Sequence, residues 1–249
     1  MFNKEEIKNN FSQSAPDYEE HAKLQKELAD ELFRSAQSLQ PLRILDIGCG
    51  TGYLARRLAE HFSKARVIGV DIAPGMIEVA DGKNSRKNLT FEIGDGETLS
   101  FPKGSFDLVV SNASLQWMDA QKVFQTVLKI LKPKGHFVFT TFGPQTLFEL
   151  KESGFQVNRF LSVGEIRKLI DGRFSIDKLD SNIAVQKFKI VKELVYHLKE
   201  IGAQSVNSDP RPGQNVLQAL RRYKENYWEG KCLTASYEVI FGKCRALLS

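Results

Sequence analysis

The sequence has few cysteines, no long apolar run and no internal repeat. Its three cysteines, Cys49, Cys232 and Cys244, form no CxxC or CxxxC pair, which argues against a zinc site or a disulfide scaffold and favours packing roles. No apolar run approaches the roughly 20 residues that cross a bilayer, and the charged start of the chain is unlike a secretory signal. We therefore expect a metal-free cytoplasmic protein without a membrane partner.

The 249 residues are 42% hydrophobic and 26% charged, as in ordinary globular proteins, and this length fits one α/β domain with an addition. The net charge of +5 is uneven, because residues 1–140 are neutral overall and residues 141–249 carry the whole excess. An acidic partner and a chance excess of surface lysine both fit this asymmetry. The chain has no dense Lys/Arg tract of the kind that binds nucleic acid, so we expect no nucleic-acid partner. We also expect a monomer.

Strand-like and helix-like runs alternate through the first 142 residues. β-branched and aromatic residues are concentrated in five runs of strand length, and stretches with helical periodicity separate them. This alternation predicts βαβ units and a parallel sheet. Strands are expected at 42–46, 65–71, 88–93, 105–111 and 135–142, helices at 52–62, 74–81 and 120–131, and a helix-ending turn at 133–135.

Both ends of the chain carry further predicted elements. Residues 1–40 are helical in pattern and are expected to form a lid. Two strands near the C-terminus enclose an insertion, residues 187–230, that is far longer than a hairpin loop and predicts a helical cap for the acceptor. The two strands are expected at 174–185 and 234–246, and the insertion is expected to hold helices at 187–202 and 216–227 and a loop at 208–213.

A glycine-rich turn, LDIGCGTG at 45–52, follows the first predicted strand and opens the next helix. Glycines there let the backbone approach a ligand, and the helix N-terminus offers free N–H groups to a carboxylate or phosphate. The dinucleotide fingerprint GxGxxG requires its third glycine where this chain has Tyr53, which disfavours a nicotinamide cofactor.

Acidic residues follow the second and third predicted strands. Asp71 lies about 20 residues after the glycines, where a carboxylate can accept both ribose hydroxyls of a nucleoside. Capping the helix that starts near Pro74 is the alternative. Asp95 can accept from an adenine amine, although a simple turn uses the same residue types.

Three motifs, at 45–52, 70–80 (VDIAPGMIEVA) and 94–118 (GDGETLSFPKGSFDLVVSNASLQWM), resemble the class I S-adenosylmethionine-dependent methyltransferases in order and spacing. The resemblance covers 42–142 as a cofactor-binding core. It implies an α/β, Rossmann-like fold with a seven-stranded, mostly parallel sheet whose last strand is antiparallel, and S-adenosylmethionine as cofactor. The implied cofactor contacts are Asp46, Gly48, Cys49, Gly50, Asp71, Met76, Asp95, Gly96, Asn112 and Leu115.

The stretch FSQSAPDYEEHAKLQ at 11–25 is similar to the FSxxAxxYxxxAxxQ start of the malonyl-[acyl-carrier protein] O-methyltransferases of biotin synthesis. NASLQW at 112–117, LKEIGA at 198–203 and residues 234–241 fit the same family, so the resemblance spans nearly the whole chain. It implies methyl transfer to the free carboxylate of a malonyl group on an acidic acyl-carrier protein or on CoA.

The same resemblance implies roles at the acceptor end. Tyr18 and Gln25 would shape the lid over the cofactor, and Tyr18, Gln116 and Trp117 would position the acceptor. A cationic group should pair with the malonyl carboxylate. The candidate substrate contacts are His197, Lys199, Arg211, Arg221 and Arg222.

The residues themselves offer no Ser/His/Asp constellation and no Asn/Asp-Pro-Pro-aromatic motif after the fourth strand. A carboxylate acceptor is consistent with this, since it is ionised at pH 7 (pKa about 4) and needs no general base. Three alternatives stay open: another small carboxylic acid or small molecule as the acceptor, a non-catalytic cofactor-binding assembly protein, and, less favoured, an RNA-modifying role.

Overall fold

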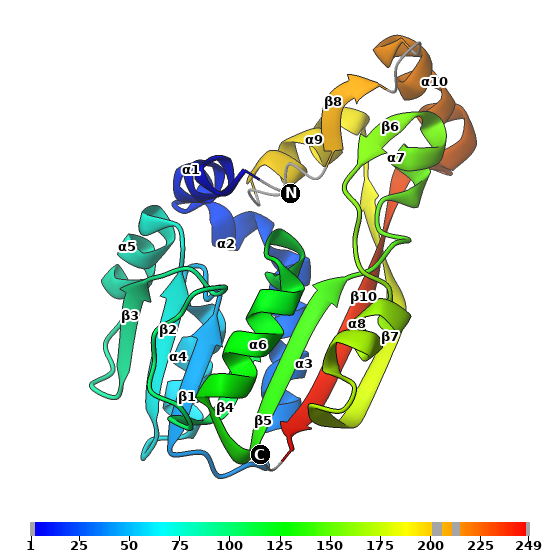
Figure 1. Cartoon of the computed structure of the whole chain (residues 1–249). Coiled ribbons are helices and arrows are strands. Elements are labelled where there is room, and N and C mark those ends of the chain that lie inside the picture. The colour runs from blue at the N-terminus through cyan, green and yellow to red at the C-terminus, as the bar shows by residue number, and fades with distance from the viewer. Residues whose placement is uncertain (1–2, 201–205, 211–214, 248–249) are drawn as a thin grey trace.

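The computed structural model, which describes residues 3–200, 206–210 and 215–247, is built on a central sheet (Figure 1). The strand order is β3-β2-β1-β4-β5-β10-β7, and β10 runs antiparallel to both β5 and β7, whereas the pairs from β3 to β5 are parallel. A short strand, β9, pairs antiparallel with the start of β10. The predicted Rossmann-like sheet is therefore confirmed. Its strands are β1 (Arg43–Ile47), β2 (Arg66–Asp71), β3 (Leu89–Ile93), β4 (Phe106–Ser111), β5 (Leu131–Phe142), β7 (Phe174–Phe188), β9 (Trp228–Glu229) and β10 (Cys232–Ala246).

Helices cover both faces of this sheet, because its central strands are apolar on both sides. In β1, Ile44 packs into the core on one face, and its neighbour Leu45 packs into the core on the other. The first face is covered by α3 (Lys23–Ala36), α4 (Tyr53–His61) and α5 (Pro74–Gly82), and the second by α6 (Ala120–Ile130) and α8 (Val163–Ile170).

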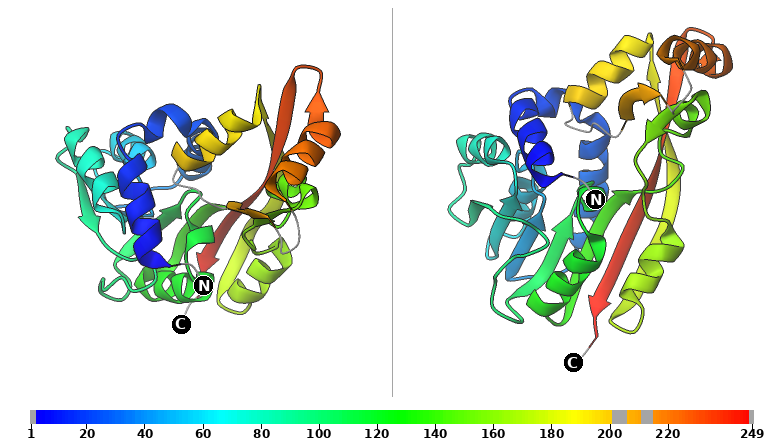
Figure 2. Two further views of the ribbon diagram at one scale, coloured as in Figure 1. Left: turned by 90° about the horizontal axis from the view of Figure 1, so that it is seen from above. Right: turned by 45° about the horizontal axis from the view of Figure 1, so that its top comes forward.

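The lid and the cap lie beyond the carboxyl ends of the strands, as both views in Figure 2 show. Buried Leu24 and Leu28 of α3 share a hydrophobic cluster with Leu194 and Tyr223 of the cap. No helix in the described ranges is both long and apolar enough to cross a membrane. The predicted lid, residues 1–40, holds α1 (Lys4–Ser14), α2 (Tyr18–His21) and α3, and the predicted cap, residues 187–230, holds α9 (Val191–Glu200), β8 (Val206–Pro210) and α10 (Val216–Tyr227). Two elements from earlier in the chain, α7 (Phe148–Ser153) and β6 (Phe155–Val157), lie beside the cap, where β6 pairs with β8.

The chain departs from the predicted elements in several places. The turn expected at 133–135 does not precede β5 but is a bulge inside it, where Lys134 has a φ of +64° and the pairing with β4 changes register. Residues 208–210 belong to β8 instead of a loop: Pro210 pairs with β6 across an irregular register, and 211–214 lie outside the described residues. The helix expected at 187–202 begins only at Val191, because residues 187–188 pair with β10 as the end of β7, and 201–202 lie outside the described residues. The elements α7, β6, α8 and β9 were not predicted at all.

Candidate active site

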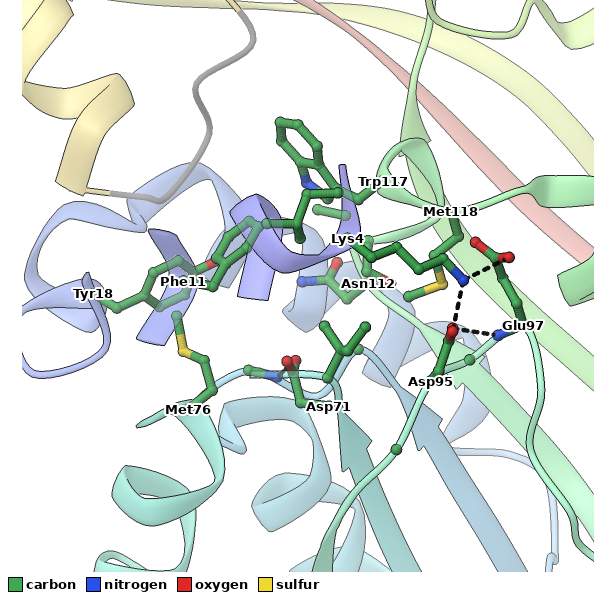
Figure 3. A pocket seen from close by; sticks show the side chains of 18 residues that line it. Lys4, Phe11, Tyr18, Asp71, Met76, Asp95, Glu97, Asn112, Trp117 and Met118 are labelled. Carbon is green, nitrogen blue, oxygen red and sulfur yellow. Dashed lines mark hydrogen bonds and ion pairs between the residues drawn. The ribbon is translucent and has the colours of Figure 1, made fainter. Parts of the chain in front are cut away.

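A cavity with two lobes lies at the carboxyl ends of β1 and β4. This is the point where the chain crosses from one side of β1 to the other, the usual ligand site of open α/β sheets. Figure 3 shows the residues that line the first lobe. The lobes share four lining residues, which are Tyr18, Gly48, Gly50 and Asn112. Of the other predicted residues, Asp71, Met76, Asp95, Gly96 and Trp117 line the first lobe, and Gln25, Asp46 and Cys49 line the second.

The glycine turn forms the floor of both lobes. Gly48 has a φ of +70°, and a Cβ added there would lie 2.5 Å from the Ser114 side chain. Gly50 has a φ of +53°, but a Cβ added there would meet nothing within 4 Å. The first glycine is therefore needed for packing and backbone conformation, whereas the second leaves open space beside the backbone.

Asp71 ties the glycine turn to the end of β2. Its carboxylate accepts from the backbone N–H of Gly50 and from that of Ala73, both at 2.9 Å. The alternative of Asp71 as the helix cap is wrong, since Ala73 is the N-cap of α5 and has no side-chain cap bond. Burial raises the pKa of Asp71, and the two N–H donors partly offset that rise.

Asp46 is a buried carboxylate that lacks a short hydrogen bond among the described residues, and its side chain lines the second lobe. Burial, and then the charge of Asp71, raise the pKa of Asp46 to about 8, and the backbone N–H of Ala55 only partly offsets that rise. The amide oxygen of Gln25, in the same lobe, is also buried and unpartnered. Because unpaired buried acceptors are costly, this lobe suits a ligand that donates hydrogen bonds, above all a cationic one.

Acidic side chains outnumber basic ones in the lining of the two lobes, although the raised pKa of Asp46 leaves it mostly neutral near pH 7. Five carboxylates line them, against two lysines, Lys4 and Lys26, among the described residues. A phosphate-bearing dinucleotide would be repelled by this arrangement, whereas a positively charged nucleoside would be attracted. The lining carboxylates are Glu19, Asp46, Asp71, Asp95 and Glu97.

Lys4 is a residue of the first lobe that sequence reasoning missed. From the start of α1, its Nζ lies 2.6 Å from Asp95 Oδ2 and 2.7 Å from Glu97 Oε2, as Figure 3 shows. Only 4% of the Glu97 side chain is exposed. These ion pairs hold α1 across the cavity, and a ring contact at 5.8 Å between Phe11 and Trp117 holds it further along. No local motif marks Lys4, because its partners lie about 90 residues away in sequence.

Replacing Lys4 by methionine is expected to release α1 and to speed dissociation of a ligand from the first lobe about 10-fold. The reason is the loss of two charge-assisted bonds, one of them to a buried carboxylate. Stopped-flow measurement of S-adenosylhomocysteine dissociation checks this. Lys8→Met is the matched control, because Lys8 lies on the same helix and pairs only with exposed Glu5. Tighter binding in Lys4→Met would show instead that Lys4 competes with the ligand for Asp95.

Two predicted residues of the loop after β4 lie beside the lobes without lining them. Leu115, in a 3₁₀ turn at Leu115–Trp117, and Gln116 line a neighbouring cavity. Asn112 does line both lobes, and its amide donates to the backbone carbonyl of Gln25 (2.9 Å) and accepts from the Thr140 hydroxyl (2.8 Å).

Tyr18 lines both lobes as well. Burial raises the pKa of Tyr18, which therefore stays protonated at neutral pH.

Of the predicted substrate contacts in the cap, His197, Arg221 and Arg222 do not line these lobes. His197 packs against the Phe188 ring, and burial followed by the charge of His21 lowers its pKa to about 4. Arg221 pairs with Glu225 on exposed α10, and Arg222 is on the same helix. Lys199 belongs to α9, and Arg211 lies outside the described residues.

The fold and the acidic, two-lobed cavity define an α/β protein of the methyltransferase type. Residues 44–135 match a family model described as a methyltransferase domain. The fold is similar to that of the YcgJ protein from Bacillus subtilis, with a TM-score of 0.68 and 18% identity over 90% of this chain and 99% of that one.

Curated relatives cover almost the whole chain. Malonyl-[acyl-carrier protein] O-methyltransferase 2 of Ilyobacter polytropus is 31% identical over 253 residues, which cover 97% of each chain. Malonyl-[acyl-carrier protein] O-methyltransferase of Hahella chejuensis is 32% identical over 231 residues, which cover 90% of this chain and 83% of that one. The chain belongs to the class I S-adenosylmethionine-dependent methyltransferases, and S-adenosylmethionine is its cofactor.

Proposed function

We propose that the protein transfers a methyl group from S-adenosylmethionine to the free carboxylate of a malonyl thioester, carried by an acyl-carrier protein or CoA. The observation that carries this proposal is the full-length similarity to relatives named for that reaction. The site supports it as well. The cofactor lobes are lined by four residues from the stretches that resemble those enzymes, which are Tyr18, Gln25, Asn112 and Trp117.

The lobes fit the cofactor part by part. The methionine ammonium would pair with Asp46, a buried carboxylate without a short hydrogen bond among the described residues. The ribose hydroxyls would donate to Asp71, and the adenine would lie between Met76 and Gly96 with its amine on Asp95. The open space beside Gly50 leaves room for the ligand against the backbone. Cys49 would contribute through its backbone, since its thiol is buried.

The chemistry asks little of the protein beyond alignment. The cofactor supplies an electrophilic methyl: a carboxylate oxygen bonds to the methyl carbon as the carbon–sulfur bond breaks, its electron pair stays on sulfur, and no proton moves. The protein must hold the acceptor in line and exclude water. Protonated Tyr18 can donate to the acceptor but does not act as a base.

A methyl-transfer panel with labelled cofactor tests the proposal. We expect methyl ester formation on malonyl-acyl-carrier protein and malonyl-CoA, and little on free malonate or other small carboxylic acids. A clear preference for a free carboxylic acid would establish the alternative acceptor class. Cofactor binding with no turnover on any acceptor would favour a non-catalytic assembly protein.

Salt dependence tests the role of the basic C-terminal part. Residues 141–249 carry the whole net charge of +5, and acyl-carrier proteins are acidic, so opposite charges should speed the encounter. We expect kcat/KM for the malonyl carrier protein to fall several-fold between about 50 and 300 mM NaCl, because the Debye length shortens. A kcat/KM that does not change with salt would show that these lysines and arginines do not attract the carrier protein.

A further inference from the structure

A second cavity, called here the side cavity, lies next to the cofactor lobes. Its walls come from the 3₁₀ turn, the start of α6, the end of β5 and the segment that enters α8. Met118 lines both the side cavity and the first lobe, so the two adjoin. Phe124, Leu161 and Ile166 give the side cavity an apolar lining.

Gln116 forms the partition between the side cavity and the cofactor lobes. Its Nε2 donates to the carbonyl of Ala113 (2.6 Å), a residue that lines the first lobe. Its Oε1 accepts from the Thr141 hydroxyl at 3.1 Å. These two bonds fix the amide, and a second N–H on Nε2 makes no further hydrogen bond among the described residues. A polar donor is thus held in place where the two cavities meet.

Arg159 is the cationic residue among those that line the side cavity in the described part of the chain. Its side chain is 82% exposed, which places the guanidinium at the mouth, and it pairs with Glu165. The other oxygen of Glu165 accepts from the backbone N–H and hydroxyl of Ser162, in the capping box that starts α8. Glu165 is therefore fixed and directs Arg159, which has further N–H groups for a ligand.

The only other ionised lining residue described is Asp119. Its carboxylate accepts from the Lys122 backbone N–H and lies 3.8 Å from that lysine's Nζ. Lys122 offsets part of the charge of Asp119, although its Nζ also lies 3.7 Å from Glu97 Oε2. Arg159 is the group of the side cavity that can attract an anion.

We propose that Arg159 binds the carboxylate of the methyl acceptor, with Gln116 guiding it toward the cofactor; this rests on the proposed function. The planar guanidinium matches a carboxylate in shape and charge, so Arg159 would draw the acceptor into the side cavity, and the Gln116 amide would direct it on toward the first lobe. Methylation removes the negative charge, so Arg159 loses its partner and the neutral ester is released. The assignment replaces Arg221 and Arg222 of the cap as carboxylate partners, because neither of them lines the side cavity or the cofactor lobes.

Binding of acid and ester forms of one ligand tests this role directly. With S-adenosylhomocysteine bound, calorimetry would give the Kd of malonyl-CoA and of its methyl ester for wild type, Arg159→Met, Arg159→Lys and Glu165→Gln. We expect wild type to prefer the free acid at least 10-fold and Arg159→Met to lose that preference with the ester Kd unchanged. Arg159→Lys and Glu165→Gln should be intermediate. Arg167→Met, an exposed arginine of α8 outside the cavity lining, is the control.

The outcomes separate the two proposals. Wild-type preference for the acid that persists in Arg159→Met would overturn the Arg159 assignment and leave the proposed function standing. Equal loss of acid and ester binding would also overturn it, because a collapsed cavity would be the cause. Failure of wild type to bind either malonyl ligand would overturn the proposed function and this assignment together.

Discussion

Replacing Asp71 by asparagine is expected to weaken cofactor binding at least about 100-fold and to leave the fold intact. Two hydroxyl hydrogen bonds to a carboxylate would be lost or weakened, each worth about 1.5–3 kcal/mol. An asparagine also offers one oxygen where Asp71 uses two to hold the N–H groups of Gly50 and Ala73. The glycine turn would therefore lose one of its anchors, and binding would suffer from both effects.

Calorimetry with S-adenosylhomocysteine measures the loss, and circular dichroism with thermal unfolding shows whether the fold is kept. Asp81→Asn is the matched control, since Asp81 is an exposed carboxylate near the end of α5. Wild-type affinity in Asp71→Asn would defeat the ribose assignment.

The cofactor lobes were predictable from sequence because their residues sit in short motifs at strand ends. A parallel sheet brings the carboxyl ends of β1, β2 and β4 to one edge, so the order of strands alone predicts that Asp46, Asp71 and Asn112 meet. The alternation of side chains along a strand also predicts which residues of β1 pack against each layer of helices.

The residues that sequence reasoning missed are brought in by packing over long separations. Lys4 reaches Asp95 only because α1 folds across the cavity. Arg159 lines the same cavity as Gln116 only because the segment after β6 returns along the sheet toward α6. One missed element did carry a local signal: Ser162 followed by Glu165 is the sequence pattern of a capping box, and it starts α8. At Lys134 a local signal was misleading: the turn residues there predicted the start of a strand, but they form a bulge inside β5 and do not end it.

The pH dependence of cofactor binding is expected to follow Asp46. Its pKa of about 8 in the ligand-free protein means that the carboxyl is mostly protonated at pH 6. Pairing with an ammonium requires the carboxylate, so affinity should rise toward 10-fold per pH unit between about pH 6 and 8 and level off above. Asp46→Asn should bind weakly at all these pH values and show no such slope.

Asp46→Asn should bind the cofactor more weakly than wild type, but in the absence of ligand it should be more stable against unfolding at high pH. Because burial raises the pKa of Asp46 above its unfolded value, its contribution to stability is complete below about pH 4 and is lost as the pH rises through about 8. Ligand-free Asp46→Asn should therefore unfold at a higher Tm than wild type at pH 8.5, and saturating S-adenosylhomocysteine should reverse that order. Calorimetric titrations from pH 6 to 8.5, with thermal unfolding at each pH, test both parts. A wild-type affinity that does not change with pH would show that Asp46 is ionised without the cofactor and that its burial carries no such penalty.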